Sequence, residues 1–384
     1  MLNIADTLHA WCREARPFAL ATIVQVSGSA PLPPGTSLAV NADGEAAGSL
    51  SGGCVEGAVY ELCTQVLEDH GPPARARFGY SADDAFAVGL TCGGEIDVLV
   101  QRVDPTDRPH LTAALDEIAH GRPAAVAQVV DGPEDLLGRT LSLLGDDGAY
   151  EGTLRGENED RAVVARTRAQ LRAGRTAVID VGGDPDTCPE RLSILVHVHA
   201  APPRMLIFGA VDFAAALSQA GSFLGYRVTV CDARPVFATA ARFPYADEVV
   251  VDWPHRYLAA TDVDARTAVC VLTHDAKFDI PLLALALSLP VAYIGAMGSR
   301  RTHEDRDRRL RETGVTTAQL TRLNSPIGLD LGAHTPEETA ISITAEIIAR
   351  THQATGLPLS QGIGPIHRPD PTGPVPARAA RTAA

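Results

Sequence analysis

Residues 206–234 read LIFGAVDFAAALSQAGSFLGYRVTVCDAR and contain two short apolar strands separated by a helix. The first strand ends at Gly209 and the second at Asp232, at about the 20-residue distance typical of a ribose-binding acid. A buried strand, a tight turn, a helix and a second strand form the opening unit of a Rossmann fold. The stretch therefore predicts a dinucleotide-type α/β domain in the second half of the chain.

The turn after the first strand departs from the pattern that binds a pyrophosphate. The positions of G-x-G-x-x-G/A hold Gly209, Val211 and Ala214. A branched side chain at the central position obstructs a phosphate, and Asp212 beside it can cap the helix and repel an anion. Three interpretations stay open: ordinary NAD binding, a structural turn capped by Asp212, or a different nucleotide pose. Asp232 correspondingly either binds a ribose or pairs with Arg234.

The alternation of short apolar strands and helices continues along the chain from Arg204. The strand segments are RMLIFG, RVTVCD, EVVVDW, AVCVLTH and VAYIGAMG. Such a pattern indicates a Rossmann-like doubly wound parallel sheet covered on both faces. A last helix is predicted from Pro336 to about His352, because Thr335 can cap it and Glu338 completes a capping box.

Ligands of doubly wound sheets bind beyond the carboxyl ends of the strands, and three further segments should lie at that edge. His274 and Asp275 follow the strand that ends in LTHD. Gly298, Ser299 and Arg300 precede a helix, where backbone N–H groups and arginine suit an anion. The loop SPIGLDLGAHTPEE (325–338) is the third. Structural explanations also stand: a histidine that caps a strand end, and arginines at a solvated helix start.

The first half of the chain reads as a mixed α/β domain. We expect a helix over 4–15, a strand over 18–26, a hairpin around residues 43–44, a helix over about 55–69 and a strand over 96–103. Residues from about 109 to 198 form a middle extension that could continue the first sheet. The expected domains are 1–200 and 204–355, followed by a disordered tail over 356–384 that is rich in Pro, Gly, Ala and Arg.

Two Gly-Cys motifs stand out in the first half, GSLSGGCVEGAVYE (48–61) and GLTCGGEIDVLV (89–100). Cys54 follows Gly52 and Gly53 at the start of a helix, a position that lowers the pKa of a thiol. Cys92 precedes Gly93 and a second glycine, which let a ligand or another chain approach the backbone closely. Each cysteine equally suits a small apolar residue packed beside a tight turn. Glu56 fits a partner for the helix dipole better than a general base.

Composition excludes several classes of protein. The formal net charge is −14 and Lys277 is the only lysine, so neither a Walker phosphate loop nor a general Schiff-base chemistry is indicated. Lys277 either adds positive charge to the sheet edge or pairs with Asp279. An acidic chain without basic runs argues against nucleic acid as a partner, and no apolar run is long enough for a membrane span. Seven scattered cysteines without CxxC pairs fit reduced thiols in the cytoplasm.

Together these segments resemble the xanthine dehydrogenase accessory protein family, XdhC/CoxI. SGSAPLPPG (27–35), GSLSGGCVEG (48–57) and TCGGEIDVLV (91–100) are similar to its amino-terminal domain. Five further segments are similar to its carboxy-terminal Rossmann domain: LGYRVTVCDAR (224–234), AARFPYADEVV (240–250), LTHD (272–275), GAMGSR (295–300) and SPIGLDLGAHTPEETAISITAEI (325–347). The resemblance covers roughly residues 18–103 and 204–350. GAVDFA stands where many members have a Gly-x-Gly-His-like turn, which puts cofactor binding at that turn in doubt.

The resemblance implies a homodimeric maturation factor that binds the molybdenum cofactor, aids its sulfuration by a cysteine desulfurase and delivers it to an apo-enzyme of the molybdenum hydroxylase type. Such apo-enzymes are xanthine dehydrogenase, CO dehydrogenase and aldehyde oxidase. On this interpretation Cys54 and Cys92 contact the cofactor, because thiolates are soft ligands. The Gly298–Arg300 loop would meet the pterin phosphate.

Two other functions remain as alternatives to a cofactor chaperone without turnover of its own. One is an NAD(P)-dependent oxidoreductase, which Val211 and Asp212 disfavour. The other is a scaffold between a cysteine desulfurase and its target enzyme, which would not need the paired cysteine motifs.

Overall fold

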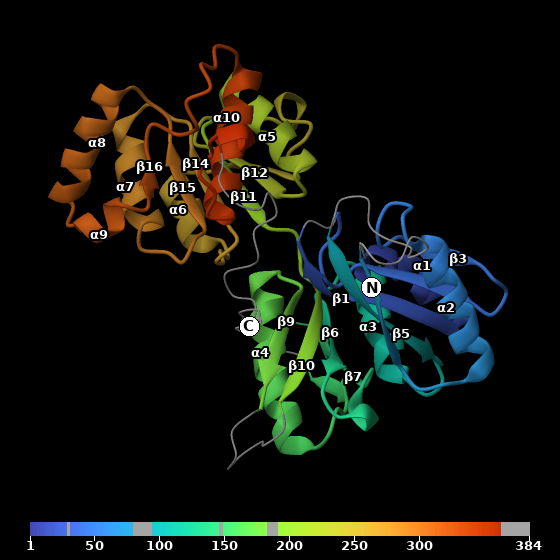
Figure 1. Ribbon diagram of the computed structural model, residues 1–384. Helices are drawn as coiled ribbons and strands as arrows, with labels where there is room; N and C mark the ends of the chain where they lie inside the picture. Colours follow the sequence, from blue (N-terminus) through green and yellow to red (C-terminus); the bar gives the residue numbers. More distant parts are fainter. Residues whose placement is uncertain (29–30, 80–93, 146–148, 183–190, 362–384) are drawn as a thin grey trace, which may run out of the picture. The chain divides into compact units, whose positions relative to one another are not determined.

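A computed structural model describes residues 1–28, 31–79, 94–145, 149–182 and 191–361 (Figure 1). One compact unit comprises Met1–Ala201, and a second begins at Pro202. In the part of the chain that is described, no helix combines the length and the apolar character needed to cross a membrane.

The first unit contains two separate antiparallel sheets of five strands each. The first sheet has the order β3-β2-β1-β5-β4. Its strands are β1 (Phe18–Ser27), β2 (Ser37–Asn41), β3 (Ala46–Gly48), β4 (Ala74–Phe78) and β5 (Glu95–Val103). The helix α2 (Glu56–Asp69) packs on β1, β2 and β5. The predicted strands and the hairpin are therefore present, and the glycine-rich loop before α2 sits at one end of this helix.

The second sheet is built from the middle extension and has the order β8-β7-β6-β10-β9. Its strands are β6 (Ala124–Asp131), β7 (Thr140–Leu144), β8 (Tyr150–Gly152), β9 (Ala177–Val181) and β10 (Leu192–His199). The helix α4 (Glu157–Ala173) covers it. The interpretation that this segment continues the first sheet is wrong, because its strands pair only with one another in the described residues.

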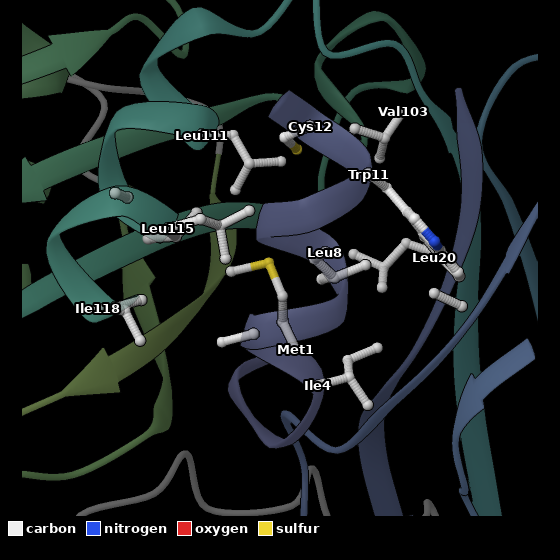
Figure 2. Close-up of a cluster of buried hydrophobic side chains, with 14 of the residues drawn as sticks. Met1, Ile4, Leu8, Trp11, Cys12, Leu20, Val103, Leu111, Leu115 and Ile118 are labelled. Atoms are coloured by element: carbon white, nitrogen blue, oxygen red, sulfur yellow. The ribbon is translucent and has the colours of Figure 1, made fainter. Parts of the chain in front are cut away.

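Two helices and both sheets share a hydrophobic core in this unit. Helix α1 (Ala5–Arg13) packs against α3 (Pro109–Ala119). Figure 2 shows Leu111 and Leu115 of α3 on the side of α1 that bears Cys12, whereas Leu8 and Trp11 of α1 point toward Leu20 of β1. The spacing of three and four residues places each apolar set on one face of its helix. The middle extension is thereby joined to the first domain through buried side chains.

The second unit is a parallel sheet of six strands with the order β13-β12-β11-β14-β15-β16. The strands are β11 (Arg204–Phe208), β12 (Arg227–Asp232), β13 (Glu248–Val251), β14 (Ala268–Val271), β15 (Tyr293–Ala296) and β16 (Leu323–Asn324). Numbered within the unit, this is the 3-2-1-4-5-6 order of a Rossmann fold. The predicted doubly wound parallel sheet is confirmed.

Helices cover both faces of this sheet (Figure 1). Along β11, Met205 and Ile207 pack with α5 (Asp212–Phe223) and α10 (Pro336–Thr351). The alternate residues Leu206 and Phe208 pack with α6 (Pro254–Ala260), α7 (Ala276–Ala286) and α8 (Arg300–Glu312). Burial on both faces explains why the strands are apolar throughout rather than alternating.

The start of α10 agrees with its sequence. The Thr335 hydroxyl accepts the N–H of Glu338 at 3.2 Å, and the Glu338 carboxylate accepts the N–H of Thr335 at 3.1 Å. The predicted capping box is therefore confirmed. The predicted disordered tail lies largely outside the described residues, although Leu359–Gln361 form a short 3-10 helix, η4.

Candidate functional site

The loop that carries Cys54 is organised around the carboxylate of Glu56, the first residue of α2. One carboxylate oxygen, Oε1, accepts the Ser49 hydroxyl at 2.6 Å and the N–H groups of Leu50, Ser51 and Gly52 at 2.8–3.1 Å. The other, Oε2, accepts the Ser51 hydroxyl at 2.6 Å and the N–H groups of Gly53 and Val55 at 2.8 and 3.2 Å. The loop thus folds around an anion that the chain itself supplies.

These hydrogen bonds keep Glu56 ionised. Burial acts to raise the pKa of Glu56, but hydrogen bonds from the hydroxyls of Ser49 and Ser51 and from backbone amides hold it well below its ordinary value of 4.5. A carboxylate saturated by donors is a poor general base. Glu56 lies in the first turn of α2, as predicted, and its carboxylate accepts hydrogen bonds from the loop that precedes the helix.

Cys54 is half-buried and packs on the apolar cluster beneath α2. Its N–H donates to the Ser51 hydroxyl at 2.9 Å. Gly52 and Gly53 are exposed and have φ angles of +75° and +121°, with open space where a side chain would stand. Their conformation requires glycine, and the space leaves their backbone accessible. Cys92 and Gly93, the second motif, lie outside the described residues.

At the carboxyl edge of the parallel sheet, Gly209 forms the turn between β11 and α5. Its φ is +113°, and a Cβ there would lie 2.9 Å from Cγ2 and 3.0 Å from the backbone nitrogen of Thr273. Glycine is therefore needed for close contact with the end of β14. Val211 is the N-cap residue of α5, with no side-chain cap, and Asp212 instead forms an ion pair with Arg242 at 3.2 Å. The predicted cap by Asp212 is wrong, because Asp212 is already the first residue of the helix.

Asp232 is buried at the end of β12 and is fully used within the protein. Its Oδ1 accepts the backbone N–H and the Nε–H of Arg234, both at 2.9 Å. Its Oδ2 accepts the N–H of Ala210 at 2.8 Å and the Arg234 guanidinium at 2.7 Å. Burial acts to raise the pKa of Asp232, but these donors lower it below its ordinary value. Of the two predicted roles, the structure displays the pairing with Arg234, and all acceptor positions that a ribose would use are occupied.

His274 and Asp275, the third and fourth residues after β14, are exposed. Asp275 is the N-cap of α7, where it accepts the N–H of Lys277 at 3.1 Å and pairs with the Lys277 ammonium at 3.0 Å. These contacts lower the pKa of Asp275. His274 lies beside it with its side chain exposed. The predicted pairing of Lys277 with Asp279 is wrong, because Asp279 points into the interior of the unit.

The Gly298–Arg300 segment follows β15 at the same edge. Ser299 is the N-cap of α8, and its hydroxyl accepts the N–H of Thr302 at 3.1 Å. Gly298 has a φ of +151°, and Arg300 and the following Arg301 are exposed. The edge thus brings together Gly209, Asp232, His274, Asp275 and Gly298–Arg300, as parallel strands require.

Beneath this edge lies a buried polar network that the sequence did not reveal. Arg306 of α8 donates to Asp279 of α7 at 3.0 Å and to the carbonyl oxygen of Met297 at 2.8 Å. It also donates to the Ser325 hydroxyl at 2.9 Å, and the Thr273 hydroxyl donates to Asp279. One guanidinium therefore connects segments that follow three neighbouring strands, β14, β15 and β16. The sequence could have indicated that Arg306 is buried, because the apolar Leu310 lies four positions later and hence on the same helix face.

The fold and its edge define a two-unit α/β protein whose second unit is a Rossmann domain. Residues 205–347 match the model of the XdhC Rossmann domain, and residues 11–79 match the model of the XdhC and CoxI family. The chain belongs to the XdhC and CoxI family.

Similar proteins extend over nearly the whole chain. The chain is 27% identical over 350 residues to a probable xanthine dehydrogenase subunit from Bacillus subtilis (strain 168), covering 91% of this chain and 97% of that protein. It is 24% identical over 335 residues to the molybdenum cofactor insertion chaperone PaoD of Escherichia coli (strain K12), covering 87% and 84%. A crystal structure described as a xanthine dehydrogenase from Bacillus halodurans is similar with a TM-score of 0.63 and 26% identity, covering 91% and 96%.

Proposed function

We propose that this protein is an accessory factor for a molybdenum hydroxylase. It binds the molybdenum cofactor as a carried ligand, assists its sulfuration and delivers it to the apo-enzyme. Membership of the XdhC and CoxI family and the similarity to a molybdenum cofactor insertion chaperone support this proposal. The partners are the apo-hydroxylase and a cysteine desulfurase, the working form is a homodimer, and the setting is the cytoplasm, where thiols stay reduced.

The observation that carries the proposal is the loop around Cys54. The thiol is half-buried beside the exposed backbone of Gly52 and Gly53, so a ligand that reaches the sulfur has room to approach. A thiolate is a soft ligand for molybdenum and a carrier for sulfur, and the loop is held rigidly by Glu56. These residues fit a bulky cargo that must be bound and then released. Cys92 and Gly93 are proposed as a second contact.

A second contact surface is proposed at the sheet edge for the phosphate end of the cofactor. Gly298 and Ser299 precede α8, and Arg300 follows with an exposed guanidinium. Helix N-termini with arginine favour phosphate oxygens. His274 and Asp275 at the neighbouring strand end are proposed to contact the polar pterin.

An NAD(P)-dependent oxidoreductase is the competing function, and the geometry of the turn weighs against it. The carboxylate of Asp232 already accepts hydrogen bonds from Ala210 and Arg234 at both oxygens. Asp212 places a negative charge beside the position of a pyrophosphate. A scaffold that binds no ligand would not need the arrangement of the Cys54 loop, which weighs against that alternative.

The proposal is tested by purifying the protein from cells that make the molybdenum cofactor and measuring bound molybdenum and oxidised pterin. We expect both to copurify with the protein. Cys54→Ala should lower cofactor retention about tenfold, the equivalent of about 1.4 kcal/mol. Cys63→Ala, which alters a buried cysteine of the same helix, should retain it. Absence of molybdenum and pterin, with NADH bound in their place, would overturn this proposal.

A further inference from the structure

Helices α5 and α10 border an apolar groove on the side of the second unit that faces away from the parallel sheet. The two helices pack against each other (Figure 1), and residues of both line a groove of about 460 Å³. Three of its large apolar side chains are exposed, Phe223 by 88%, Ile341 by 58% and Ile348 by 45%. Apolar side chains gathered on a surface in this way mark an interaction site. No residue of the groove belongs to the sheet edge proposed for the cofactor, so the groove calls for a different partner.

Helix α10 is apolar on two sides, whereas an ordinary surface helix carries one apolar stripe. Ile343 and Ile347 are buried in the core of the unit, and Ile341 and Ile348 point outward. Thr344 is buried between the two exposed isoleucines, so small side chains lie at the bottom of the groove and large ones at its rim. Such alternation lets the side chains of another helix interdigitate. The outer side of α10 therefore fits a helix.

The outer stripe of α10 has a symmetric pattern. Glu337, Ile341, Ile348 and His352 follow one another at spacings of four, seven and four residues, which places them on one face of the helix. If two copies of the helix pack antiparallel, Ile341 of each copy meets Ile348 of the other, and Glu337 meets His352. An imidazole N–H suits a carboxylate, and Arg350 adds a positive charge to the same end of the helix. A parallel pair would instead bring like groups together, so the charges favour antiparallel self-association.

We propose that a second copy of this chain docks in the groove, with the two α10 helices antiparallel about a two-fold axis that passes between Thr344 and Ala345. The same patch then serves both partners, as in an isologous dimer. This inference rests on the homodimer of the proposed function and assigns its contact surface. An acidic lipid surface is a poor occupant, because Glu337 is the charged residue among the described residues that line the groove. A helix of another protein is the competing occupant, and the oligomeric state distinguishes the two.

Sedimentation equilibrium of the full chain tests the surface. We expect a dimer, and Ile341→Glu should raise its dissociation constant about a hundredfold, because the change occurs twice in a symmetric interface. Val236→Glu is the matched control, since Val236 is an exposed apolar residue of the same unit outside the groove, and it should match wild type. Circular dichroism verifies that the variants fold. If Ile341→Glu does not fold, Phe223→Ser takes its place with the same expectation.

Charge reversal tests the antiparallel arrangement. Glu337→Arg should weaken the dimer about tenfold, because it places a cation opposite His352 of the second copy. The double variant Glu337→Arg/His352→Glu restores opposite charges at these positions and should regain most of the affinity. A double variant that binds more weakly than either single variant would contradict the antiparallel arrangement.

Cross-linking tests the position of the axis. In the proposed dimer the two copies of position 345 are offset by only about 1.5 Å along the helices, so oxidation of Ala345→Cys should yield a covalent dimer. Peptide mapping excludes bonds between native cysteines. Ala349→Cys is the control, because Ala349 is half-buried on the same helix like Ala345, but its two copies lie about 14 Å apart along the helices, beyond the reach of a disulfide.

The outcomes separate this surface from the proposed function. A dimer that Ile341→Glu leaves intact, or equal cross-linking at positions 345 and 349, would overturn the surface while the homodimer stands. A wild-type chain that stays monomeric would overturn both, and the groove would then fit a helix of another protein. Bound molybdenum and pterin are measured on the same samples, and their absence from an intact dimer would refute the carrier role alone.

Discussion

The guanidinium of Arg306 lies 3.0 Å from the carboxylate of Asp279, and the two residues are only 3% and 4% exposed. This ion pair fastens α8 to α7 under the edge of the parallel sheet. Burial raises the pKa of Asp279 even though Thr273 and Arg306 donate hydrogen bonds to it. Without Arg306, an ionised Asp279 would therefore destabilise the folded state strongly.

Arg306→Met should therefore destabilise the second unit by about 3–5 kcal/mol, because it leaves a buried carboxylate unpaired. Denaturant unfolding measures the change. The double variant Arg306→Met/Asp279→Leu should recover much of the loss. Arg308→Ala, which breaks exposed ion pairs on the same helix, should cost at most about 1 kcal/mol. Equal losses for Arg306→Met and Arg308→Ala would contradict a structural role for the buried pair.

Acidification should weaken the first unit through Glu56. Its pKa is lowered by folding, so the stability it contributes is present above its ordinary value of 4.5 and is lost as the pH falls from there toward the folded pKa. Glu56→Gln should cost about 2 kcal/mol at pH 7, and the gap from wild type should narrow between pH 4.5 and 3. Urea unfolding at these pH values provides the measurement. A gap that stays constant with pH would show that the charge of Glu56 is not what stabilises the loop.

Gly209→Ala should destabilise the second unit by about 3 kcal/mol, because it adds a clash with Thr273 to a strained backbone. Gly225→Ala is the matched control: its φ of +79° is also positive, but a Cβ there meets nothing within 4 Å. It should cost about 1 kcal/mol. Thermal unfolding of both variants separates the two contributions, and equal costs would rule out the close approach of β14 as the reason for glycine.

Asp212→Asn should strengthen the binding of adenine nucleotides about fivefold if the negative charge of Asp212 repels a nucleotide phosphate at the turn after β11. It removes an anion from the start of α5 and releases the guanidinium of Arg242 from its ion pair. Titration with NADH, followed by fluorescence, checks the change. Asp305→Asn on the exposed face of α8 is the control. Unchanged binding would mean that the turn does not receive a nucleotide phosphate.

The sequence by itself determined five of the six strands of the second unit, because short apolar strands alternating with helices permit one layered arrangement. The two-residue strand β16 was not predicted, because it is too short to show a pattern. The capping box of Thr335 and Glu338 was equally legible, since both partners lie within three residues. Local patterns also placed Cys54 beside two glycines at a helix start. The sequence did not show whether residues 109–198 extend the first sheet or form a second one, because strand pairing depends on contacts distant in sequence.

Only the tertiary structure decided which charged groups pair. Arg306 is one of several arginines in α8, and its partner lies on another helix 27 residues away. From the sequence, Asp232 could either bind a ribose or pair with Arg234. The structure shows that it pairs with Arg234 and also accepts the N–H of Ala210. Glu56 likewise looked like an ordinary acidic residue in a first helical turn. Side-chain hydrogen bonds depend on distances of a few tenths of an ångström, which the three-dimensional packing of the chain sets and the order of its residues does not display.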